Sequence, residues 1–249
     1  NLDQLLAINN AMKYPLAYIQ GPPGTGKTNT ILNTIVTAFF NNMTVLFASY
    51  NNVPINNVFE KLSSLTYKGK RVAFPVLRLG NQEKVKECIC YINQLRREVH
   101  GIKVFSSTLD RRKGDRIDRA KQLSGRLKEY EEVLDLTERK ETLTQVMEYQ
   151  ERMKNVATLF HFHTDLQGRQ LRNLDEKIQK IGEISERDAM ALLDRNEDEF
   201  YSYLYYTSAK YIKELESNRF QDLRKILDDD EDVMSRQQHL TSICRNRRM

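Results

Sequence analysis

The sequence predicts an α/β protein in which a partial parallel sheet is followed by a long all-α coiled-coil segment. Three observations predict it. A glycine-rich loop follows a short apolar run near residue 20, predicted strands and helices alternate as far as about residue 82, and charged helix-forming sequence fills the rest. We therefore predict two parts, an α/β part at residues 1–82 and a helical coiled-coil part at residues 83–249.

The glycine-rich loop follows the first predicted strand, Leu16 to Gln20, and precedes an amphipathic helical pattern. It reads Gly-Pro-Pro-Gly-Thr-Gly-Lys-Thr and fits the P-loop pattern G-x-x-x-x-G-K-[ST]. Its glycines would let backbone N–H groups turn toward phosphate oxygens, Lys27 would reach the β- and γ-phosphates, and Thr28 would ligate Mg²⁺. A glycine turn of purely structural use is the alternative. The predicted nucleotide site comprises Gly21, Pro22, Pro23, Gly24, Thr25, Gly26, Lys27, Thr28 and Asn29.

Two further strands are predicted in the α/β part, at residues 44–49 and 72–79, with a helix between them from about Ile55. Strand–helix–strand order is typical of a parallel sheet covered by helices. The carboxyl ends of parallel strands lie at one edge of a sheet, where ligands bind. The P-loop and the loop Tyr50 to Pro54 are both predicted at that edge.

Beyond about Gln82 the pattern is that of long charged helices. A turn near residues 165–168 would let a first helical arm, residues 116–164, fold back on a second arm. Residues 185–188 are expected to cap a further helix, and residues 199–227 are expected to be helical. Tyrosines in the last segment could stack on bases, although their helical spacing favours packing. The a/d spacing of a coiled-coil seam is seen for Leu123, Leu127, Tyr130 and Leu134, and for Leu171, Leu174, Ile178 and Ile181.

Charge and cysteine content narrow the function classes. The net charge of +5 resides in residues 1–80, which favours an anionic ligand larger than a nucleotide, although an ordinary solvated surface gives the same count. Cys88, Cys90 and Cys244 predict free thiols in a reducing compartment. No run approaches the roughly 18 apolar residues of a membrane span. We expect no membrane partner and a cytoplasmic location, or a nuclear one in a eukaryote.

Three stretches together resemble superfamily 1B helicases, the group that includes the RNA-surveillance and Okazaki-processing helicases: Asn1-x-x-Gln4, Pro15 to Thr28 and Val45 to Leu62. The resemblance covers about residues 1–82. It implies a RecA-like domain that uses ATP and Mg²⁺, with Gln4 as the Q-motif residue that reads the adenine edge.

The resemblance also implies that the loop around Asn51 and Asn52 is motif Ia, which contacts the backbone of single-stranded DNA or RNA. We add Asn56 and Asn57 to these candidate strand contacts. The alternative is that the asparagines only cap the following helix. The sequence departs from the family in having Asn51 where Ser or Thr is usual and Pro-Ile-Asn at residues 54–56 where Ala-Val-Asp is usual.

The predicted function is the N-terminal part of an ATP-dependent helicase or translocase. No Walker B strand ending in Asp-Glu is recognisable, and we expect it, the arginine finger and the second RecA-like domain beyond Met249, so this fragment alone should hydrolyse little ATP. The chain begins without methionine inside a motif, which also predicts a piece of a longer protein. The helical part stands where the family often inserts a domain and could serve a protein partner or self-association. The alternatives are an AAA+ ATPase that remodels proteins and a non-catalytic coiled-coil scaffold.

Overall fold

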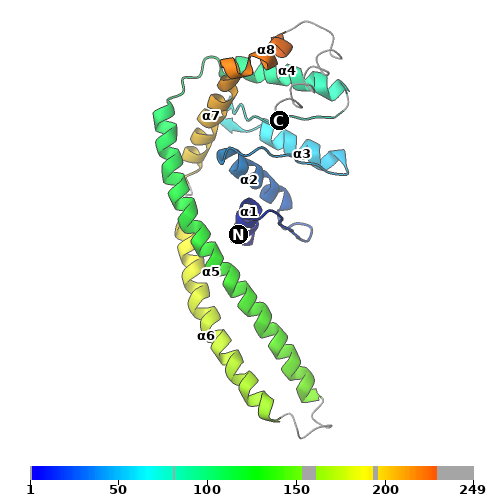
Figure 1. Ribbon diagram of the computed structural model, residues 1–249, viewed down its shortest axis with the longest axis vertical. Helices are drawn as coiled ribbons and strands as arrows, with labels where there is room; N and C mark the ends of the chain where they lie inside the picture. Colours follow the sequence, from blue (N-terminus) through cyan, green and yellow to red (C-terminus); the bar gives the residue numbers. More distant parts are fainter. Residues whose placement is uncertain (1, 81, 153–160, 193–195, 229–249) are drawn as a thin grey trace. The chain divides into compact units, whose positions relative to one another are not determined.

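The computed structural model describes residues 2–80, 82–152, 161–192 and 196–228, and most of these residues are helical (Figure 1). The chain forms two compact units. Unit 1 contains Asn1–Ala38 and Asp115–Arg195, and unit 2 contains Phe39–Gly114 and Asn196–Met249. None of the helices in the described ranges is long and apolar enough to cross a membrane.

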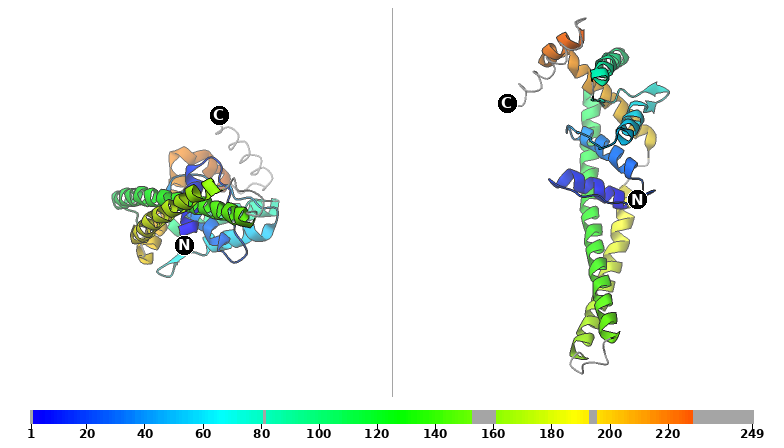
Figure 2. Two further views of the ribbon diagram at one scale, coloured as in Figure 1. Left: turned by 90° about the horizontal axis from the view of Figure 1, so that it is seen from below. Right: turned by 90° about the vertical axis from the view of Figure 1, so that its right-hand side faces the viewer.

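Unit 1 is built from four helices: α1 (Leu2–Lys13), most of α2 (Lys27–Phe40), the part of α5 (Ser106–Arg152) that follows Gly114, and α6 (His161–Leu192). Within this unit, α6 lies alongside α5 (Figures 1 and 2). Its core cluster consists of Leu2, Leu127 and Ala189, against which Leu5, Leu6, Leu123 and Tyr130 pack.

Helix α1 is attached to α5 by polar contacts as well as by this core. The Tyr130 hydroxyl donates a hydrogen bond to Asp3 Oδ1 at 2.8 Å, and Asn10 Nδ2 donates one to Glu131 Oε1 at 3.1 Å. The apolar side chains of α1 recur at helical spacing, and Leu2 is its buried residue. These contacts fix the orientation of α1, which carries Gln4.

The interface between α5 and α6 differs from the predicted seam at one position. Leu127 is buried, but Leu134 is 40% exposed and Val133, at 9%, is buried in its place. A Cβ atom added to Gly182 would lie 3.8 Å from Val133 Cγ1, so Val133 faces α6 where that helix has no side chain. The prediction for Leu134 was therefore wrong, because the glycine on the facing helix admits the neighbouring valine.

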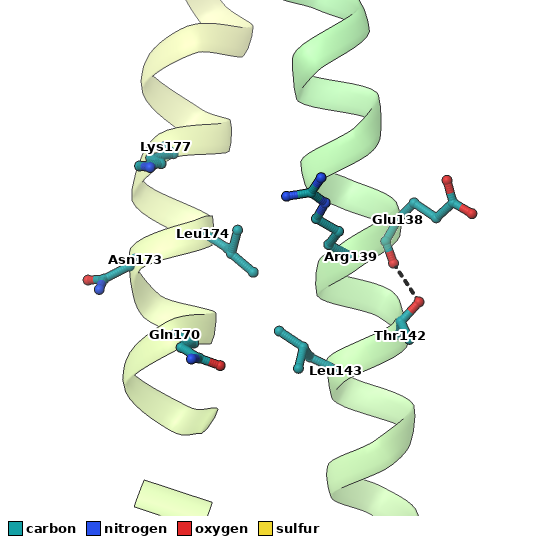
Figure 3. A pocket seen from close by; sticks show the side chains of 8 residues that line it. All are labelled: Glu138, Arg139, Thr142, Leu143, Gln170, Asn173, Leu174 and Lys177. Carbon is teal, nitrogen blue, oxygen red and sulfur yellow. Dashed lines mark hydrogen bonds between the residues drawn. The ribbon is translucent and has the colours of Figure 1, made fainter. Parts of the chain in front are cut away.

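Farther along the pair, Leu143 of α5 and Leu174 of α6 point toward one another across a groove of about 600 Å³ (Figure 3). The rest of its lining is polar: Glu138, Arg139, Thr142, Gln170, Asn173 and Lys177. Ion pairs also join the helices, between Lys140 and Asp175, and between Arg126 and Asp188 at 3.1 Å. The interface thus combines a thin apolar seam with charged pairs at its sides.

Two predicted boundaries within this part were wrong. Residues 165–168 and 185–188, expected as a turn and as a helix cap, both lie inside α6, and the first arm ends at Arg152. A single Gly168 costs a helix only about 1 kcal/mol and no proline interrupts the segment, so the helix continues through both sites.

Unit 2 contains α3 (Asn52–Ser63), the two-residue strands β1 (Thr66–Tyr67) and β2 (Lys70–Arg71), α4 (Gln82–Val99), α7 (Glu197–Lys213) and α8 (Gln221–Asp228). Strands β1 and β2 pair antiparallel through a turn at Lys68 and Gly69, whose φ angles of 48° and 74° are typical of a type I′ hairpin. The core cluster is Ala73, Leu95, Val99, Ala209 and Ile212.

Helix α7 buries the tyrosines that the sequence left open between packing and base stacking. Tyr203 and Tyr205 are 4% and 7% exposed, and the Tyr203 ring packs on Phe40 with centroids 5.0 Å apart. Next to them, Ser208 and Ala209 are fully buried, and such small side chains allow close approach of a neighbouring element. The packing interpretation is confirmed for these two tyrosines.

The single helix predicted for residues 199–227 is interrupted. Two 3₁₀ turns, η2 (Glu214–Glu216) and η3 (Asn218–Phe220), separate α7 from α8. Arg96 of α4 forms ion pairs with Glu216 at 2.7 Å and with Asp228 at 2.6 Å. These contacts, distant in sequence, attach the turn η2 and the last residue of α8 to α4.

The two cysteines that the structure describes are free thiols, as predicted. Burial raises the pKa of the Cys88 thiol to about 11, whereas Cys90 is exposed. Cys244 lies outside the described residues.

The predicted parallel sheet is not formed among the described residues. Residues 16–20 and 44–49 have no strand partner there, and Leu16 and Leu46 are each 88% exposed. In residues 72–79, Phe74 N–H bonds to Val72 O and Val76 N–H bonds to Phe74 O, both at 2.8 Å, which are the tight turns of an unpaired segment. A strand is stabilised by ladder hydrogen bonds from a neighbour, and these segments lack one here.

Replacing Val133 by Asp should destabilise unit 1 by about 2–4 kcal/mol, because an unpaired carboxylate would face α6. Leu134→Asp is the matched control and should cost about 1 kcal/mol or less, since Leu134 is largely exposed. Urea denaturation followed by circular dichroism measures both. Equal losses, or a larger loss for Leu134→Asp, would show that the seam runs through Leu134.

Candidate functional site

The phosphate loop lies in unit 1, between residues 16–20 and helix α2, and its shape requires glycine. Gly24 and Gly26 have φ angles of 85° and 81°, which L side chains rarely adopt. A Cβ atom on Gly21 would lie 2.7 Å from Thr25 Oγ1, whose hydroxyl donates to Pro22 O at 2.9 Å. The exposed residues of the predicted site are Pro22, Pro23, Gly24, Thr25, Lys27, Thr28 and Asn29.

Lys27 is the first residue of α2 and folds back over the loop. Its Nζ donates hydrogen bonds to Gly21 O at 2.6 Å and to Pro22 O at 2.8 Å. The first turn of α2 carries no acidic residue, so no carboxylate of that turn neutralises the positive end of the helix dipole. An ammonium group and a helix N-terminus therefore lie at the same loop, which suits an anionic group.

Gln4 of α1 meets this loop. Its Nε2 donates a hydrogen bond to Thr25 O at 2.9 Å, and a Cβ atom on Gly26 would lie 2.6 Å from the same nitrogen. Thus the absence of a side chain at Gly26 leaves room for Gln4. The structure brings Gln4 together with the P-loop, a contact that the sequence did not specify.

The asparagine loop lies in unit 2, at the start of α3. Asn51 occupies the N-cap position, but its side chain makes no capping hydrogen bond, and its backbone N–H donates to Ser49 Oγ at 3.4 Å. Asn52 begins the helix, and Asn56 and Asn57 lie within it. All four asparagines are exposed, and Tyr50 before them is fully exposed. The capping alternative therefore does not account for the polar side chains of this segment.

Arg78 is a neighbour of these asparagines that sequence reasoning missed. Its Nη2 donates to Asn52 Oδ1 at 2.8 Å, its Nε donates to Asn56 Oδ1 at 3.1 Å, and its Nη1 donates to Leu79 O. A signal was present in the sequence, because Arg78 stands near the carboxyl end of the third predicted strand. That is the sheet edge at which the asparagine loop was expected.

The sequence as a whole identifies the protein family to which the chain belongs. Residues 1–239 match the family described as AAA domain. The chain belongs to the AAA domain family. Membership confirms the P-loop NTPase class, and AAA domains in general use a nucleotide and a divalent metal ion.

Parts of this AAA domain are also similar to individual known proteins. It is 31% identical over 114 residues to the DNA replication ATP-dependent helicase/nuclease JHS1 of Arabidopsis thaliana. The aligned residues make up 42% of this chain and 8% of that protein. It is 32% identical over 90 residues to the DNA-binding protein SMUBP-2 of Mus musculus, covering 36% and 8%. It is 37% identical over 76 residues to Regulator of nonsense transcripts 1 of Dictyostelium discoideum, covering 29% and 6%.

The chain thus spans less than a tenth of the length of these relatives. Together with the family match, they confirm the predicted resemblance to superfamily 1 helicases. No solved structure matches the sequence significantly.

The residues of the AAA domain fit a nucleotide with its metal better than a metal alone. In the part of the chain that the structure describes, no three His, Cys, Asp or Glu side chains gather into a metal site. Asp175 of α6 is paired with Lys140 instead. The exposed Thr28 hydroxyl at the start of α2 could supply one ligand, and phosphate oxygens would have to supply others.

Proposed function

We propose that this AAA domain is the N-terminal, ATP- and strand-binding part of an ATP-driven superfamily 1 helicase or translocase. The observation that supports the proposal is that Gln4 and Lys27 both bond to the phosphate loop, as the amide of a Q motif and the cation of a P-loop would. The names of the relatives refer to helicases, to DNA binding and to nonsense transcripts. They lend no support to the alternative of an ATPase that remodels proteins.

ATP would bind by replacing contacts that the loop now makes with itself. The Lys27 ammonium would exchange the carbonyl oxygens of Gly21 and Pro22 for β- and γ-phosphate oxygens, which carry negative charge and therefore accept stronger hydrogen bonds. Backbone N–H groups of the loop and of the first turn of α2 would hold the remaining oxygens. The second N–H of the Gln4 amide and its Oε1 take no part in the bond to Thr25 O, and they would be available to hydrogen-bond to the adenine edge.

Mg²⁺ bound to the phosphates would offset their charge during hydrolysis. In this proposal the Thr28 hydroxyl is its ligand from this chain. The described residues contribute no Walker B carboxylate, and the transition-state charge would lack a cation from a second domain. We therefore expect this chain alone to bind ATP and to hydrolyse little of it.

Lys27→Ala should weaken ATP binding by about 2 kcal/mol, or roughly 30-fold, since it removes a charged hydrogen-bond donor from the phosphates. Lys13→Ala, which removes the same charge from the exposed end of α1, is the control and should bind like the wild type. Titration calorimetry with ATP and Mg²⁺ measures both variants. Equal affinity of Lys27→Ala and wild-type protein would refute the assignment of the phosphate site.

For nucleic-acid binding, we propose that the start of α3 contacts the backbone of single-stranded DNA or RNA through Asn51, Asn52, Asn56 and Asn57. Exposed amides suit phosphate and sugar oxygens, contacts that position a strand without reading its sequence. The fully exposed ring of Tyr50 is available to stack on a base, which is likewise tolerant of sequence. Affinity should then depend on salt and little on base composition.

The double substitution Asn51→Ala with Asn52→Ala should reduce strand-stimulated ATPase activity of the full-length protein. The concentration of strand needed for half stimulation should rise about 30-fold, at about 1 kcal/mol for each of the two lost hydrogen bonds. The melting temperature should change little, because Asn51 makes no capping bond and the bond that Asn52 accepts from Arg78 lies on the exposed surface. A fall in melting temperature with undiminished stimulation per folded molecule would instead assign the asparagines to helix stability.

The pair α5 and α6 is the third part of the proposal. We propose that it is a helical insertion that serves a protein partner or self-association. Its support is the length of the two helices, of 47 and 32 residues, and the mostly polar surface that they expose around a thin seam.

A further inference from the structure

We propose that Arg78 is a positioning residue for strand binding, which fixes the amides of Asn52 and Asn56 so that their NH₂ groups face an incoming phosphate backbone. This inference rests on the proposed function, because it assumes that the start of α3 contacts a single strand. It adds a residue to that surface, together with a reason for the type of side chain.

The geometry of the contact is specific to arginine. Asn52 and Asn56 are four residues apart and so lie on one face of α3, one turn from each other. The Nε and Nη2 groups of Arg78 donate to the two Oδ1 atoms at 3.1 and 2.8 Å. These two groups share one edge of the planar guanidinium, so a single rigid side chain spans the helical turn. Lysine, with one nitrogen, could not hold both amides in a fixed plane.

The direction of these hydrogen bonds determines what each asparagine offers. Since Oδ1 accepts from Arg78, the amide is held with Nδ2 directed away from the guanidinium. No described residue accepts a hydrogen bond from Nδ2 of Asn52 or Asn56, and both side chains are exposed. The arrangement therefore presents two sets of fixed donors to solvent. Phosphate and sugar oxygens are acceptors that such donors fit.

The charge of the cluster points to the same ligand. The partners of Arg78 are neutral amide and carbonyl oxygens, and no carboxylate in the described ranges forms an ion pair with it. The first turn of α3 carries no acidic residue either. Hence the guanidinium charge is not offset, and it adds attraction for a polyanion to the positioning of the donors. An arginine that served only to tie residues 77–79 to α3 would not need exposed amides as its partners.

The test uses full-length protein and two probes, fluorescein-labelled oligo(dT) and oligo(U), with fluorescence anisotropy to measure affinity. Both Arg78→Ala and Arg78→Lys should weaken binding of the strand about tenfold, because the amides of Asn52 and Asn56 stay in place but are no longer held in the orientation that suits the strand. The strand concentration for half-maximal ATPase stimulation should rise in parallel. ATP affinity, the rate at saturating strand and the melting temperature should remain those of the wild type.

Two comparisons make the test decisive. Arg97→Lys, on the exposed side of α4, is the matched control and should behave like the wild type. If Arg78→Lys binds the strand as tightly as the wild type, charge alone matters and the positioning role is refuted. Unchanged affinity of Arg78→Ala, or a loss of melting temperature with intact binding per folded molecule, also refutes it. Failure of the wild type to bind either probe would refute strand binding itself, whatever the Arg78 variants do.

Discussion

The left-handed backbone of the phosphate loop is the constraint on which the candidate nucleotide site depends. Gly24 and Gly26 adopt positive φ angles, which bring the loop back to the start of α2. Only in that conformation can the Lys27 ammonium reach the carbonyl oxygens at the beginning of the loop, and only without a side chain at Gly26 can Gln4 approach Thr25. A local backbone requirement thus positions the Lys27 cation, the N-terminus of α2 and the Gln4 amide together.

Elements determined by local sequence could be predicted, whereas elements that need a distant partner could not. Helix α2 and the P-loop were identified because their signals lie within a few turns or one motif. The parallel strands were wrongly expected as paired, because apolar runs such as residues 44–49 show the tendency to be extended but not whether a neighbour supplies ladder hydrogen bonds. At the break between α7 and α8, η2 and α8 bond to Arg96, more than 100 residues away in sequence, and no local pattern reveals these contacts.

The α5–α6 interface shows the same limit at the level of single residues. Heptad spacing identified the correct face of α5, as the burial of Leu127 shows, but it favoured Leu134 over the adjacent Val133. The choice is made by Gly182 on the other helix, where a missing side chain leaves space for the valine. Similarly, the contact of Arg78 with the asparagines could not be predicted, because Asn56 and Asn52 lie 22 and 26 residues earlier in the sequence. Only the position of Arg78 near the end of a predicted strand pointed to the sheet edge where the asparagine loop was expected.

Helix α1 gives the phosphate loop a mechanical connection to the long helices of unit 1. Adjacent residues of α1 bond in two directions, Gln4 to Thr25 O in the loop and Asp3 to the Tyr130 hydroxyl of α5. Leu2, next to them, is part of the cluster with Leu127 and Ala189. A packed core resists small displacements, so a shift of Thr25 must either break its bond to Gln4 or move α1 against α5. In unit 1, therefore, the helix whose Gln4 bonds to the loop is also an element through which a change in the loop would reach the α5–α6 pair.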